Sequence, residues 1–253
     1  MSFLLASDLD RTLLYSKRFL TEYPTTVPLT LVENYNGEPL SYMSDQALTQ
    51  LAWLNDHAHF VPVTTRTTAQ YNRIFGITAL QPRYAITTNG AEVLYKGEPD
   101  ARWAQHITAQ ANPKYAQMYR YMTQLDGVER HYDVQHFMYA ITTKPAPKEA
   151  VDVARELGFT MSQQGRKLYF VPSYLTKWQA TAYVAEQCGA NFIYAAGDSR
   201  LDVPLLEGAH AAILMRHGTD GIDHLPITTA SGIAATEEML ATAIAHAKRL
   251  GHN

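Results

Sequence analysis

The chain has 253 residues, 46% of them hydrophobic, which is enough for a large core or for a core with a second module. Its formal net charge of −3 is spread along the chain, which argues against a nucleic-acid groove or an anionic membrane surface as the main partner. A single cysteine, Cys188, excludes an intramolecular disulfide and a cysteine-built zinc site, and the lack of a signal-length or membrane-length apolar run predicts a soluble, cytoplasmic protein.

The first predicted element is a short buried strand over residues 3–6, an apolar run that ends at once in polar residues. Asp8 and Asp10 follow it on the same side, because side chains alternate along an extended chain. Two carboxylates this close repel each other unless a cation or a proton compensates them. They indicate a divalent-metal site, an acid beside an ionised neighbour, or a carboxylate nucleophile; a helix cap and a turn acid are the structural alternative.

A β-hairpin and a helix are predicted next. Residues 28–33 and 38–43 flank the turn pair Asn36-Gly37, so the hairpin falls between the first strand and the first helix, where it would lie over the strand ends. Ser44 is a typical N-cap for a helix over residues 45–57, whose leucines are spaced for one buried face.

Two more strands with a helix between them complete the first part of the chain. The pattern predicts strands over residues 60–63 and 84–87 and a helix over residues 68–75. The residues that follow the two strands are polar and include Thr64, Thr65 and Asn89.

The pattern changes between residues 91 and 171. A strand and a helix lead there into strands near 129–134 and 136–143, a helix over 147–157, and strands over 159–162 and 167–171. Neighbouring strands with turn-length connections favour antiparallel pairing, so residues 91–171 are predicted to form an inserted α+β domain. Residues 1–90 and 172–253 would then form the core.

Alternating strands and helices return after the insertion. The predicted elements are a helix over 176–188, a strand over 192–196, a short helix over 203–207, a strand over 211–215 and a helix over 236–250. This alternation predicts an α/β fold with a doubly wound parallel sheet, which binds ligands at the carboxyl ends of its strands. The polar residues directly after predicted strands are Asp8, Asp10, Thr64, Asp198 and Asp202.

Several carboxylates at one sheet edge make an oxygen-rich site that suits Mg²⁺ and does not suit zinc or copper. The Thr64 hydroxyl and the Lys177 amine at a helix start add a donor and a point charge, which match a phosphoryl group in transfer. The residues therefore indicate phosphoryl chemistry assisted by a hard cation.

Four segments of the chain also resemble the motifs of haloacid dehalogenase-superfamily phosphatases, in the same order. They are residues 8–12 (Asp-Leu-Asp-Arg-Thr), Val63-Thr64, Lys177 and residues 197–202 (Gly-Asp-Ser-Arg-Leu-Asp). Residues 87–91 and the insertion after them resemble the branch with a class-two cap, which includes the Cof-type sugar phosphatases, sucrose-phosphatase and mannosyl-3-phosphoglycerate phosphatase. Four ordered motifs are far more specific than any one of them.

The resemblance implies a role for each matched position. Asp8 would attack phosphorus and become the aspartyl-phosphate, while Asp10 would protonate the leaving oxygen and then activate water. Thr64 and Lys177, with Thr65 beside them, would hold the phosphoryl oxygens. The implied magnesium ligands are Asp8, the Asp10 backbone carbonyl, Asp198 and Asp202.

The chain departs from the family pattern at two positions. Arg11 stands where these phosphatases usually carry a small residue, and Thr65 stands where many carry glycine. Arg11, Ser199 and Asn89 are candidates for contacting the substrate. The alternative for Arg11 is a solvated arginine on the turn, while the Ser199 hydroxyl is equally suited to orient an acid or to cap its loop.

The predicted function is Mg²⁺-dependent hydrolysis of a small phosphorylated metabolite, such as a sugar phosphate, with the inserted domain as a cap that selects the substrate. A phosphomutase or phosphotransferase of the same superfamily is the nearest alternative, and a non-catalytic phosphate-binding module is a second. We expect no nucleic-acid or membrane partner.

Overall fold

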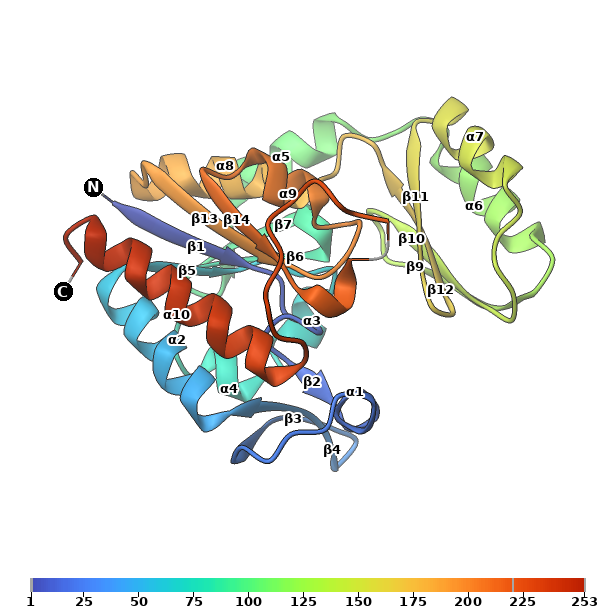
Figure 1. Cartoon of the computed structure of the whole chain (residues 1–253). Helices are drawn as coiled ribbons and strands as arrows, with labels where there is room; N and C mark the ends of the chain where they lie inside the picture. The colour runs from blue at the N-terminus through green and yellow to red at the C-terminus, as the bar shows by residue number, and fades with distance from the viewer. Residues whose placement is uncertain (1, 220, 253) are drawn as a thin grey trace. The chain divides into compact units, whose positions relative to one another are not determined.

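Four parallel strands in the order β14-β13-β1-β5 form the central sheet of the larger of two units in this computed structural model (Figure 1). The structure describes residues 2–219 and 221–252, and the larger unit comprises Met1–Asp100 and Lys177–Asn253. The strands are β1 (Phe3–Ser7), β5 (His59–Pro62), β13 (Phe192–Gly197) and β14 (Ala211–Leu214). The predicted α/β class with a parallel core sheet is confirmed.

The register of β1 decides which residues meet at the edge of this sheet. All five β1 residues are buried, and Ser7 lies opposite Pro62 of β5 and Ala196 of β13. Asp8 therefore leaves the sheet at the same edge as the residues that follow β5 and β13. β6 (Tyr84–Thr87) extends this edge through a parallel bridge between Val63 and Ile86.

Helices cover both faces of the sheet. Figure 1 shows α2 (Asp45–His57) and α10 (Ile233–Arg249) on one face, and α8 (Lys177–Cys188) and α9 (Val203–Gly208) on the other. The predicted cap of α2 is present, because the Ser44 hydroxyl accepts a hydrogen bond of 3.1 Å from the Ala47 amide. Within the described part of the chain, no helix combines the length and apolarity needed to cross a membrane.

Two predicted helices have different bounds in the structure. The helix expected over residues 68–75 is two short helices, α3 (Thr68–Tyr71) and α4 (Phe75–Thr78), because the chain leaves helical geometry at Ile74, whose ψ is 77°. The C-terminal helix begins at Ile233 and not at Thr236, directly after Gly232, which takes a φ of 63°.

The predicted hairpin forms as β3 (Leu29–Tyr35) and β4 (Glu38–Ser44). Asn36 and Gly37 take φ angles of 52° and 82°, as a two-residue turn with two left-handed positions requires. β2 (Tyr15–Ser16) pairs with β4, and an unpredicted helix, α1 (Lys17–Glu22), follows it. The α1 sequence contains no long apolar pattern, but Ser16 caps it by accepting from the Phe19 amide.

The second unit comprises Ala101–Thr176 and contains an antiparallel sheet in the order β11-β12-β10-β9. Its strands are β9 (Val128–Asp133), β10 (Met138–Thr142), β11 (Phe159–Gln164) and β12 (Lys167–Pro172), and its helices are α5 (Ala101–Ala109), α6 (Tyr115–Gln124) and α7 (Glu149–Glu156). Its core joins alternate residues of β10 and β12 to Met118 and Met122 of α6 and Ala154 of α7. The predicted α+β pattern of the insertion is therefore present.

The boundary between the units falls later than expected at both ends. The strand expected at the start of the insertion is β7 (Glu92–Tyr95); it belongs to the larger unit, and so does β8 (Glu98–Pro99), which the sequence pattern does not predict. The reason is the tight connection η1 (Thr88–Gly90), which folds β7 back antiparallel onto β6 and so keeps it in the same sheet as β6.

A close contact between α4 and the hairpin gives a stability test. A Cβ atom added at Gly76 would lie 2.4 Å from Cγ1 of the buried Val32. We expect Gly76→Ala to lower the free energy of unfolding by about 1–3 kcal/mol, because this overpacking outweighs the better helix propensity of alanine. Urea unfolding measures the effect, and an unchanged midpoint would show that the hairpin can move away from α4.

Candidate active site

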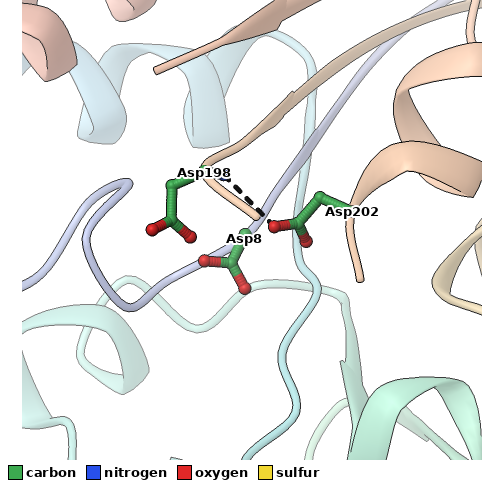
Figure 2. Close-up of side chains that lie close together, drawn as sticks. All are labelled: Asp8, Asp198 and Asp202. Carbon is green, nitrogen blue, oxygen red and sulfur yellow. Dashed lines mark hydrogen bonds between the residues drawn. The ribbon is translucent and has the colours of Figure 1, made fainter. Parts of the chain in front are cut away.

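Three buried carboxylates meet at the carboxyl edge of the parallel sheet. Asp8 follows β1, while Asp198 and Asp202 lie in the loop between β13 and α9. Each offers an oxygen within 4.8 Å of the others, and Figure 2 shows the three carboxylates gathered around one point. The Asp8 amide donates 2.9 Å to the Ala196 carbonyl, which links the ends of the two strands.

The Lys177 amine compensates part of this negative charge. Lys177 is the first residue of α8, its side chain is 1% exposed, and its Nζ donates 2.5 Å to Asp8 Oδ1 and 2.5 Å to Asp202 Oδ1. Burial lowers the pKa of Lys177, but the charges of Asp202 and Asp8 outweigh it, so its pKa lies above the usual value. Lys177 therefore carries a positive charge at neutral pH.

One lysine does not neutralise three carboxylates, and the acid pKa values reflect this. Burial raises the pKa of Asp8 to about 7; the Asp202 charge adds to the rise and Lys177 opposes it. Burial, with the charges of Asp8 and Asp202, also raises the pKa of Asp198 well above its usual value. Neighbouring like charges in a desolvated site are a typical setting for a cation.

Asp202 organises the loop that carries Asp198. Its Oδ2 accepts hydrogen bonds from the Asp198 amide (3.2 Å), the Ser199 amide (3.0 Å) and the Ser199 hydroxyl (2.7 Å). Gly197 is needed at the start of this loop, because a Cβ there would lie 2.4 Å from the Asp202 Cβ. The Ser199 hydroxyl thus both orients an acid of the site and closes its own loop, and its expected contact with the substrate stays a prediction.

The Asp10 side chain lies outside the carboxylate cluster and is bound by Arg66. Arg66 Nε donates 2.7 Å to Asp10 Oδ2, and Nη2 donates 2.7 Å to Asp10 Oδ1. The third nitrogen of the same guanidinium, Nη1, donates 2.7 Å to Oε1 of the fully buried Glu33. Half of the Asp10 side chain is exposed, so its carboxylate is open to solvent beside this ion pair.

Thr64 and Asn89 are brought together after β5 and β6. Thr64 is fully buried; its carbonyl accepts 2.9 Å from the Asn89 amide and its hydroxyl accepts 3.1 Å from the Arg66 amide. Asn89 is buried and takes a left-handed φ of 57°. Thr65 lies half-buried in the same turn, and its expected contact with phosphate stays a prediction.

Arg11 lies beside Asp198. Its Nε is 3.4 Å from Asp198 Oδ2, its Nη2 donates 3.2 Å to the His217 carbonyl, and its backbone takes a left-handed φ of 62°. His217 Nδ1 accepts from the Gly232 amide, so Nε2 carries the hydrogen and donates 2.6 Å to the Arg11 carbonyl. The Arg11 side chain is 44% exposed, and its expected contact with the substrate stays a prediction.

Sequence reasoning missed three residues of this neighbourhood. The Thr12 hydroxyl donates a hydrogen bond of 3.3 Å to Asp8 Oδ2, and its place in the first motif could have indicated that it belongs to the site. Arg66 directly follows the Thr64-Thr65 pair, so its position also pointed to the site. Glu33 carries no local signal, because a glutamate in a hairpin strand is normally expected to face solvent.

The donor set fits a hard divalent cation. Asp8, Asp198 and Asp202 offer only oxygen atoms, and oxygen is the ligand that Mg²⁺ prefers. Asp202 already accepts one hydrogen bond on Oδ1 and three on Oδ2, whereas Asp8 accepts one on each oxygen, so Asp8 and Asp198 are the carboxylates best placed to bind such an ion directly. The cluster could therefore hold a metal.

Comparison with known proteins shows which family and which solved structures this chain is similar to. The profile of a family described as sucrose-6F-phosphate phosphohydrolase matches residues 1–222. The structure is similar to the sucrose-phosphatase from Synechocystis sp. PCC6803 in complex with sucrose and phosphate, with a TM-score of 0.70, 18% identity, and 98% of this chain and 99% of that chain covered. It is also similar to BT1666 from Bacteroides thetaiotaomicron, a phosphatase of the haloalkanoate (HAD) superfamily, with a TM-score of 0.60, 14% identity, and 98% of this chain and 96% of that chain covered. A third similar structure is Thermoplasma acidophilum 0175, with a TM-score of 0.63, 12% identity, and 98% of this chain and 99% of that chain covered. Comparison with curated proteins found no match.

The raised acid pKa values give a pH-dependent test of cation binding. In the metal-free protein, the Asp8 pKa of about 7 lies above its usual value of 3.8, so protonated Asp8 favours the folded state and this contribution is lost as pH rises from about 4 to about 7. A cation competes with that proton, so MgCl₂ should raise the Tm more at pH 8 than at pH 6. Asp198→Asn is the control and should lose most of the increase. An equal shift at both pH values would argue against binding at these carboxylates.

Proposed function

The chain belongs to the sucrose-6F-phosphate phosphohydrolase family of haloacid dehalogenase-superfamily phosphatases, and from this membership we propose that it hydrolyses a phosphate monoester of a small sugar through an aspartyl-phosphate at Asp8. One observation carries the proposal: a buried carboxylate at the end of the central strand is held by a buried lysine, with two more acids beside it. Such a carboxylate can act as a nucleophile, because the positive charge of the lysine reduces its repulsion from an approaching phosphate.

Asp8 is the proposed nucleophile. One of its oxygens forms the new bond to phosphorus while the bond from phosphorus to the sugar oxygen breaks. Lys177 on Oδ1 and Thr12 on Oδ2 fix the plane of the carboxylate, so the oxygen that attacks is oriented before substrate arrives. Water then attacks phosphorus of this acyl phosphate, and the bond from phosphorus to the Asp8 oxygen breaks, which frees the carboxylate and inorganic phosphate.

Asp10 is the proposed proton carrier. It gives a proton to the leaving sugar oxygen in the first step and takes one from the attacking water in the second. Its half-exposed carboxylate, two residues from Asp8, suits a group that meets both the leaving group and solvent.

Thr64 and Lys177 are the proposed ligands of the phosphoryl oxygens, with Thr65 beside them. The Thr64 hydroxyl accepts from the Arg66 amide, so its own hydrogen is left to donate. The Lys177 charge would partly neutralise the phosphoryl oxygens as negative charge develops on them.

Mg²⁺ is the proposed cofactor, held by Asp8 and Asp198, with Asp202 binding directly or through water and the Asp10 carbonyl as a further ligand. When bound, it supplies charge that offsets the repulsion between the carboxylates and the phosphate.

A sugar phosphate is the proposed substrate class. The family description names a sugar phosphate, and the Synechocystis relative was solved with sucrose and phosphate. The part of the inserted unit in choosing among sugars stays a prediction.

The function is tested by phosphate release from a panel of phosphorylated sugars with MgCl₂. We expect turnover of at least one sugar phosphate, and Asp8→Asn, which keeps the shape of the side chain, should lower kcat by about 10³-fold or more because the nucleophile is lost. Circular dichroism checks that the variant is folded. Undiminished turnover by folded Asp8→Asn would contradict the nucleophile assignment.

Beryllium fluoride gives an independent test of the covalent step. The ion mimics a phosphoryl group on a carboxylate, so it should inhibit the enzyme only when Mg²⁺ is present, and crystals should show it on Asp8. Equal inhibition of Asp8→Asn, or an adduct elsewhere, would argue against this site.

A further inference from the structure

Glu33 is a buried carboxylate that the proposed chemistry does not use. Its side chain is fully buried, and it accepts hydrogen bonds from Arg66 Nη1 (2.7 Å), Arg73 Nη2 (3.3 Å) and the Ser41 hydroxyl (2.6 Å). Burying a charge costs several kcal/mol, whereas an apolar side chain would pack the hairpin without this cost. Packing of the hairpin alone therefore does not explain why a carboxylate occupies this position.

A β-bulge turns Glu33 into the protein. Leu31 pairs with Tyr42 and Glu33 pairs with Ser41, so Val32 is an extra residue with no partner on β4. Both Val32 and Glu33 are consequently buried, although neighbouring residues of a regular strand point to opposite faces. Bulges of this kind re-aim single side chains and are common next to active sites.

Arg66 connects Glu33 to Asp10. All three guanidinium nitrogens are engaged: Nε and Nη2 on Asp10, and Nη1 on Glu33. The fork fixes the plane of the Asp10 carboxyl, and a carboxyl oxygen has two lone pairs, of which one hydrogen bond from Arg66 uses one. Glu33 is the described partner that holds Nη1, so it helps to keep the guanidinium in the plane in which it binds the half-exposed Asp10 carboxylate.

We propose that Glu33 is a positioning residue, which holds Arg66 and through it orients the Asp10 carboxyl for proton transfer to the leaving oxygen. The inference rests on the proposed function, because it gives Asp10 the role of acid. The β3–β4 hairpin would then take part in the reaction through Glu33, together with the residues that lie directly after β1.

The test uses phenyl phosphates whose leaving groups differ in acidity. A poor leaving group such as phenol needs a well-placed acid, whereas 2,4-dinitrophenol leaves without one. The parameter kcat/KM reports steps up to departure of the leaving group, so slow hydrolysis of the phosphoenzyme does not affect it. We expect Glu33→Gln to lower kcat/KM for phenyl phosphate by about 10- to 100-fold and for 2,4-dinitrophenyl phosphate by less than about threefold.

Arg73→Gln is the matched control. It removes a charge from the same cluster and a partner of the same Glu33 oxygen, but Arg73 has no hydrogen bond to Asp10 in the described residues. We expect the ratio of the two kcat/KM values to stay that of the unmodified protein. Should Glu33→Gln fail to fold, Arg66→Lys carries the test, because lysine keeps the charge but cannot bridge both acids, and it should show the same selective loss.

An equal loss on both esters for Glu33→Gln and Arg66→Lys would overturn the proposal and leave Glu33 with a structural role only. Failure of the proposed function looks different. If Asp10→Asn also leaves the ratio unchanged, Asp10 is not the acid; if no ester is hydrolysed by the unmodified protein with MgCl₂, the phosphatase assignment itself fails.

Discussion

The ion pairs of Lys177 with Asp8 and Asp202 are the constraint on which the rest of the site depends. Three acids within 4.8 Å, all buried, would repel one another strongly, and a lysine 2.5 Å from two of them offsets part of this repulsion. The remaining negative charge is what makes the site suitable for a cation and, with it, a phosphate. The same amine thus helps the folded state and prepares the site for an anionic substrate.

The general plan of the site could be predicted from the sequence, because parallel strands end at one edge of their sheet. Asp8, Thr64 and Asp198 each follow a short apolar run, so one rule about topology is enough to bring them together. The assignment of Lys177 to the site depends on the family motifs, because a lysine at the start of a helix is common and by itself indicates no function. The roles of these residues remain proposals, but their proximity is a property of the structure.

The parts that could not be predicted depend on backbone irregularities and on long-range pairing. Alternation along β3 would send Glu33 or Val32 outward, and only the bulge explains why both are buried. The pairing of Arg66 with Asp10 joins residues from two loops, so no sequence spacing reveals it. The helix α1 was missed for another reason: it is short and depends on one cap at Ser16, which gives no extended apolar pattern.

The position of β1 between β5 and β13 has a consequence for biosynthesis. Its partner β13 is separated from it by most of the chain, including the whole of Ala101–Thr176. During translation the apolar Phe3–Ser7 segment can pair on only one side until residues near 192–197 leave the ribosome, and an unpaired apolar strand edge is prone to association. The edge of the sheet that carries Asp8 and Asp198 is therefore among the last parts of the larger unit that can assemble.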